Sequence, residues 1–109
     1  MTMKERPVVF ISQPMSGLDI SEIKEVRDRI MKKLENDFGR ALYIIDNLQE
    51  DKDPETTTHL MYLGEDVRLL DNADIVYFAK GWEKSRGCNI EFQVAREYGI
   101  RMIFEEDTI

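Results

Sequence analysis

Four short apolar runs alternate with three longer amphipathic segments along this chain. The apolar runs span residues 7–12, 41–45, 74–79 and 101–104. The amphipathic segments, in which apolar residues recur every three or four positions, span residues 18–38, 58–73 and 85–98. Short unbroken apolar runs are typical of strands buried on both faces, and the longer period is typical of helices. The pattern therefore predicts strands and helices in strict alternation.

Strict alternation predicts a parallel sheet joined by right-handed crossover helices. We expect an α/β fold, a small flavodoxin- or Rossmann-like three-layer sandwich with a parallel sheet of about four strands. In the first helix, Asp19 and Glu22 have the spacing of a capping box, and Gly39 marks the end. Residues 46–57 are polar and acidic and contain Pro54, which predicts a mobile loop.

The helix expected over residues 85–98 carries a carboxylate on its apolar side. Projected at roughly 100° per residue, Glu91 lies at the centre of an arc that it shares with Cys88, Val94 and Ala95. A carboxylate that faces the protein body is costly unless it is paired, hydrogen-bonded or lining a cleft. Catalysis is one reason to keep it there, and a purely structural acceptor is the other.

The helix expected over residues 58–73 repeats this arrangement. Asp66 projects into the apolar stripe of Leu63 and Leu70, and His59 lies in line with it. Two such carboxylates can converge on one pocket and divide into nucleophile and acid. The pattern does not fix the distance between Asp66 and Glu91, and a partly buried Asp can equally be a structural hydrogen-bond acceptor.

Ligands of parallel α/β sheets bind outside the carboxyl ends of the strands. Three segments meet there: residues 13–17, the turn after Ala79, and the start of the helix that carries Glu91. Neither a dinucleotide fingerprint nor a P-loop is present. Ser16 or Ser85 could still offer a hydroxyl to a phosphate or sugar near a helix start, although turn and capping chemistry also explains them.

Composition narrows the function classes. The 109 residues suggest one domain, 1–109, and the net charge of −7 argues against a nucleic-acid polymer or an anionic membrane as partner. No apolar run approaches the length of a membrane span, and no signal-peptide pattern is present. The single cysteine, Cys88, fits a reducing compartment, so we expect a cytoplasmic protein. One histidine and one cysteine make no usual zinc site, and we expect no cofactor.

Several segments of this sequence resemble the motifs of one protein family. Residues 10–17, Phe-Ile-Ser-Gln-Pro-Met-Ser-Gly, resemble the first strand and loop of small nucleoside 2-deoxyribosyltransferase-like proteins. Asp66, eight residues before Asp74, resembles their acid ahead of the third strand. The segment Gly81-Trp82, Ser85-x-Gly87 and Glu91 resembles their hallmark helix, in a form found in a compact phage and bacterial branch related to 2′-deoxynucleoside 5′-phosphate N-hydrolases.

The resemblance covers nearly the whole chain and implies cleavage or transfer of the N-glycosidic bond of a nucleoside or nucleotide. It implies that Glu91 attacks the anomeric carbon and forms a glycosyl-enzyme intermediate, and that Asp66 binds or protonates the base. It also implies a homodimer or larger, in which a neighbouring subunit completes the site. The substrate-binding residues that it implies, together with the loop analysis, are Phe10, Ser12, Gln13, Pro14, Met15, Ser16, Gly17, Trp82, Ser85 and Gly87.

Two alternatives stay open beside this enzyme. One is a catalytically silent nucleotide-binding or sensor module, which is favoured by Phe10 because the family has a tyrosine there. The other is a glycohydrolase that acts on a nicotinamide dinucleotide with the same glutamate. Trp82 is equally open between stacking on a base and packing in the core. Base preference, ribose against deoxyribose, and hydrolysis against transfer are likewise open.

Overall fold

The computed structural model describes residues 6–105 and confirms the alternating α/β order. Its elements are β1 (Val8–Ser12), α1 (Ile20–Phe38), β2 (Tyr43–Ile44), α2 (His59–Leu70), β3 (Ile75–Phe78), a single 3₁₀ turn η1 (Trp82–Lys84), α3 (Arg86–Glu97) and β4 (Arg101–Phe104). The four strands form one parallel sheet in the order β2-β1-β3-β4. Residues 1–5 and 106–109, the two ends of the predicted domain, lie outside the described residues.

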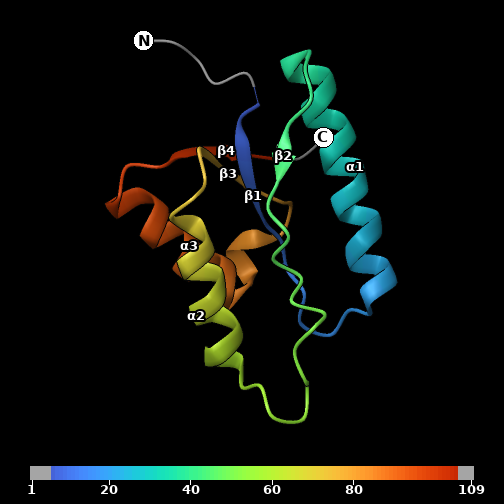
Figure 1. Ribbon diagram of the computed structural model, residues 1–109, viewed down its shortest axis with the longest axis vertical. Coiled ribbons are helices and arrows are strands. Elements are labelled where there is room, and N and C mark those ends of the chain that lie inside the picture. The colour runs from blue at the N-terminus through green and yellow to red at the C-terminus, as the bar shows by residue number, and fades with distance from the viewer. Residues whose placement is uncertain (1–5, 106–109) are drawn as a thin grey trace.

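Three layers build the molecule, with α1 on one face of the sheet and α2 and α3 on the other (Figure 1). Along β1, Val9 and Ile11 pack with Ile30 of α1, whereas Phe10 packs on the opposite face with Leu70 and Ala95. Both faces of the central strands β1 and β3 are buried, and this is why these strands are apolar without alternation.

The start and end of α1 agree with the sequence. The side chain of Asp19 accepts a hydrogen bond from the Glu22 amide at 2.9 Å, which satisfies one of the free N–H groups at the helix start. Gly39 closes the helix in the left-handed conformation with φ of 66°, which suits a residue without Cβ.

Two predicted elements are shorter than expected. The second strand was expected over residues 41–45, but β2 spans only Tyr43–Ile44, and just past its end the Ile45 amide still donates to the Val9 carbonyl at 2.9 Å. The helix expected over residues 58–73 ends at Leu70, because the chain tightens into the turn that enters β3. The third helix begins at Arg86 with Ser85 as its N-cap, close to the prediction. Within residues 6–105, no helix is long and apolar enough to cross a membrane.

Candidate functional site

A cleft of about 760 Å³ opens at the carboxyl edge of the sheet. Its walls come from the loop after β1, the segment after β2, one side of α2, and the turn that leads into α3. The volume lies within the range of about 300–1,000 Å³ that is usual for small-molecule sites. The sequence placed the site at this edge, and both predicted carboxylates, Asp66 and Glu91, line the cleft.

Glu91 is buried, with only 4% of its surface exposed. The Ser12 hydroxyl, at the end of β1, donates a hydrogen bond of 2.6 Å to Oε1 of Glu91. This contact joins the end of the central strand to the middle of α3 across 79 positions of sequence. Ser12 itself is fully buried and does not line the cleft, so it acts on the site by orienting Glu91.

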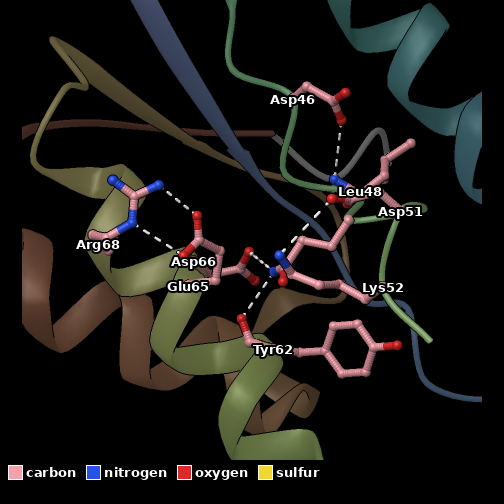
Figure 2. Close-up of polar contacts among 9 residues, drawn as sticks. Asp46, Leu48, Asp51, Lys52, Tyr62, Glu65, Asp66 and Arg68 are labelled. Atoms are coloured by element: carbon pink, nitrogen blue, oxygen red, sulfur yellow. Dashed lines mark hydrogen bonds and ion pairs between the residues drawn. The ribbon is translucent and has the colours of Figure 1, made fainter. Parts of the chain in front are cut away.

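Asp66 reaches the same point from α2, and its carboxyl group interacts directly with that of Glu91. The Gln49 side-chain amide donates to Oδ1 of Asp66 at 2.9 Å and to the Tyr62 carbonyl at 2.9 Å. Figure 2 shows Asp66 and the Tyr62 carbonyl facing the segment that carries Leu48 and Lys52. The distance between Asp66 and Glu91, which the sequence could not predict, is therefore short. The loop after β2 holds α2 in place through the Gln49 hydrogen bonds.

The two carboxyl groups hold protons more tightly than isolated acids do. Burial raises the pKa of Glu91 to about 8, with the neighbouring Asp66 adding to the effect and the Ser12 hydrogen bond opposing it. Burial likewise raises the pKa of Asp66 to about 6, against the hydrogen bonds from Glu91 and Gln49. Two coupled acids of this kind share one proton near neutral pH, which is the arrangement that general acid–base chemistry uses.

Arg27 of α1 is a cation close to this pair. Its Nη1 donates to the Ile45 carbonyl at 3.5 Å, while Nε and Nη2 are buried and have no hydrogen-bond partner among the described residues. Burial lowers the pKa of the guanidinium, and the nearby Asp46, Asp66 and Glu91 oppose that effect. Its positive charge in turn lowers the pKa of both site carboxyls.

Cations and a helix start lie at the mouth of the cleft. Lys84, Ser85 and Arg86 line it together with Ser16 from the loop after β1. The Ser85 Oγ accepts from the Cys88 amide at 3.3 Å as the N-cap of α3, and its hydroxyl can in turn donate, either to the Cys88 thiol or to a ligand. Backbone amides at a helix start and nearby cations suit a phosphate group.

Four residues that were expected to bind substrate do not line the cleft: Ser12, which holds Glu91 from behind, and Trp82, Phe10 and Gly17. Trp82 instead packs against Phe78, Phe92 and Phe104, at centroid distances of 5.1, 5.0 and 5.5 Å, which is the core alternative left open by the sequence. Phe10 is fully buried between the sheet and the α2–α3 layer. Gly17 is exposed and lies outside the lining. The other predicted residues that do line it are Gln13, Pro14, Met15, Ser16, Ser85 and Gly87.

Sequence reasoning missed Arg27, Asn47 and Gln49. Arg27 had a usable signal, because it lies four residues after Ile23 and three before Ile30, on the buried face of α1. No sequence signal pointed to Gln49, since the position of its side chain depends on a backbone φ of 55° in a loop. Cys88 lines the cleft as well, but burial raises the pKa of its thiol and so disfavours the reactive thiolate. Within residues 6–105, no group of three or more His, Cys, Asp or Glu side chains could hold a metal ion.

The fold and the cleft define a small α/β protein with a carboxylate pair at the carboxyl edge of a parallel sheet. The chain belongs to the family described as a domain of unknown function, DUF4406, whose family model matches residues 7–104. That match includes the loop after β1 and both carboxylates. No curated protein and no solved structure matches the chain.

Proposed function

We propose that this protein cleaves or transfers the N-glycosidic bond of a nucleoside or nucleoside 5′-monophosphate through a glycosyl intermediate on Glu91. The observation that carries the proposal is a buried glutamate, held by Ser12 and in contact with Asp66, on the wall of a cleft of small-molecule size. The resemblance of residues 10–17 and 81–91 to nucleoside 2-deoxyribosyltransferase-like proteins supports the same chemistry.

The shared proton gives each carboxyl its role. In the empty cleft burial raises the pKa of both carboxyls, so the pair retains a proton that can pass between Glu91 and Asp66. Its transfer to Asp66 when substrate binds produces a nucleophilic carboxylate and a neighbouring acid in one step. The Arg27 cation favours the ionised form of Glu91.

Bond changes then follow the logic of a retaining glycosidase. An oxygen of Glu91 forms a bond to C1′ while the bond from C1′ to the base nitrogen breaks. The bonding electrons go to the base, which takes the proton from Asp66. Water next attacks C1′, its proton passes to Asp66, and Glu91 leaves as a carboxylate. A second base in place of water makes the reaction a transfer.

A 5′-phosphate is supported by the residues at the mouth of the cleft. Ser85 can donate its hydroxyl, and Lys84 and Arg86 bring positive charge to the same rim in a protein whose net charge is −7. We infer from this local excess of donors that monophosphates bind more tightly than the corresponding nucleosides.

A homodimer or larger assembly in the cytoplasm remains part of this proposal. Leu60 and Met61 at the start of α2 are 77% and 57% exposed, and Leu60 also lines the cleft, so a second copy that covers them would help to close the site. The molar mass of the purified protein in solution tests this. The free, buried Cys88 agrees with a reducing compartment.

One observation favours the silent binding module instead. A carboxyl whose pKa is raised to about 8 is mostly protonated at neutral pH, and a protonated carboxyl is a poor nucleophile. That module would bind a nucleotide in the same cleft without releasing the base.

The deciding experiment incubates the purified protein with nucleosides, their 5′-monophosphates and a nicotinamide dinucleotide, and separates the products by chromatography. Free base from the wild type, and none from Glu91→Gln, is the expected result. Glu97→Gln is the matched control, because Glu97 lies on the same helix but is exposed. Equal turnover by Glu91→Gln would refute the nucleophile, and tight binding without any release would establish the silent module.

A further inference from the structure

Two side-chain amides in the cleft have fixed orientations. The Gln13 Nε2 donates to the Ile23 carbonyl at 3.1 Å, and the Asn47 Nδ2 donates to the Ile11 carbonyl at 3.4 Å. Reversing either amide would set its oxygen against a backbone carbonyl oxygen, so the hydrogen-bond network decides which end is which. Both side chains are buried, at 5% and 3% exposure, and both line the cleft.

The oxygens of these amides are left without donors. Neither Oε1 of Gln13 nor Oδ1 of Asn47 has a hydrogen-bond partner in the part of the chain that the structure describes, and both atoms are buried. A buried acceptor without a donor costs about 1–3 kcal/mol, so native proteins rarely keep one. Two of them on the wall of one cleft point to a ligand that brings its own donors.

The position of Asn47 relates these acceptors to Glu91. Its amide is anchored on Ile11, the residue immediately before Ser12, and Ser12 donates to Glu91. Gln13 is the residue immediately after Ser12. One acceptor is therefore anchored on the residue before Ser12, and the other belongs to the residue after it. In a pentose bound with C1′ above Glu91, the hydroxyl nearest to that point is the one on C2′.

We propose that Gln13 and Asn47 accept hydrogen bonds from the ring hydroxyls of a ribose, including the C2′ hydroxyl, so that the substrate is a ribonucleoside 5′-monophosphate. This inference rests on the proposed function for its site and adds the sugar class that the function leaves open. A 2-deoxyribose has hydrogen in place of that hydroxyl and leaves a buried acceptor unpaired. Hydrogen bonds to the 2-hydroxyl also strengthen in the glycosyl-transfer transition state.

Base N–H groups are the other donors that could meet these oxygens. The leaving base has to lie beside Asp66 of α2, which protonates it, whereas Gln13 and Asn47 are anchored on the α1 start and on β1. A sugar phosphate that lacks any base separates the two possibilities, because it should bind with the same preference for ribose.

The test is calorimetric binding of ribose 5-phosphate and 2-deoxyribose 5-phosphate to the wild type, Asn47→Leu, Gln13→Leu and the control Gln93→Leu. Gln93 carries an exposed amide on α3, away from the cleft lining. We expect the wild type and Gln93→Leu to bind the ribose compound about tenfold or more tightly than the deoxyribose compound. In Asn47→Leu or Gln13→Leu that ratio should fall toward one.

Equal binding of the two sugars by the wild type, tighter binding of deoxyribose, or binding of neither would overturn the proposal, even if a variant fails to fold. Retention of the preference in both leucine variants would overturn it as well. Release of base from ribo- and deoxyribonucleotides at equal rates would sustain the proposed function and refute the ribose assignment. Selective binding of ribose 5-phosphate without release of base from any nucleotide would sustain the ribose assignment and refute the proposed function.

Discussion

At the scale of single residues, the site depends on how a buried negative charge is compensated. Glu91 has one hydroxyl donor, Ser12, and one neighbouring acid, Asp66, while Arg27 supplies the nearby positive charge. Burying a carboxylate in protein costs free energy unless such groups surround it. Arg27 therefore balances the charge of the pair.

Arg27→Met should make both carboxyl groups harder to ionise. The Arg27 charge lowers the pKa of Asp66 and of Glu91, so its removal raises both pKa values further above those of isolated acids. A titration of the side-chain carboxyl ¹³C shifts reports the two pKa values directly and does not depend on knowing the substrate. Lys32→Met, on the exposed side of the same helix, should leave the titration unchanged. Unaltered pKa values in Arg27→Met would show that its charge does not reach the pair.

At the scale of elements, the loop after β2 fixes α2 against the sheet through Gln49. Its φ of 55° is left-handed, which is unfavourable for a residue with a side chain, by about 1–2 kcal/mol. The conformation persists because the side-chain amide bonds both the Tyr62 carbonyl and Asp66. Strain of this kind is typical of functional sites, where surrounding contacts hold it in place.

Substitutions at Gln49 should separate the strain from the hydrogen bonds. Gln49→Leu keeps the unfavourable backbone and loses both bonds, so we expect it to lower the free energy of unfolding by about 1–3 kcal/mol. Gln49→Gly loses the same bonds but relieves the left-handed strain, so its loss should be smaller by about 1 kcal/mol. Urea denaturation of both variants measures the difference. Equal stabilities, or a less stable glycine variant, would mean that backbone strain is not stored at this position.

The elements also show what sequence can and cannot predict here. The apolar runs predicted the positions of β1 and β3, because strands covered on both faces leave an unbroken signal, and also that of β4, which is only partly buried. β2 is shorter than its run, because regular pairing with β1 covers only Tyr43 and Ile44. Helical projection found that Asp66 and Glu91 face inward, but it carries no information on how far apart two helices place them. That distance follows from Gln49 and the packing of α2, which only the fold reveals.

At the scale of the whole molecule, the carboxyl pair should make folding stability depend on pH. Burial raises the pKa of Glu91 from its ordinary value of 4.5 to about 8, so between these pH values the folded protein keeps a proton that the unfolded chain releases. Rising pH then favours unfolding, by about 1.4 kcal/mol per pH unit for each proton retained. Asp66 adds to this loss of folding stability at lower pH, between its ordinary pKa of 3.8 and its raised pKa of about 6.

Glu91→Gln isolates this effect from the other charges of the chain. Glutamine keeps an oxygen that can accept from Ser12, and it has an amide that can donate to Asp66, so it resembles the protonated glutamate at every pH. We expect the wild type to lose stability relative to this variant as the pH rises from 5 to 8, and the variant to be the more stable of the two at pH 8. Urea denaturation of both proteins at several values across that range, with exposed Glu97→Gln alongside, measures the difference. A constant difference would mean that Glu91 ionises in the folded state as readily as it does in the unfolded chain. The shared proton, and with it the division of the pair into nucleophile and acid, would then have to be abandoned.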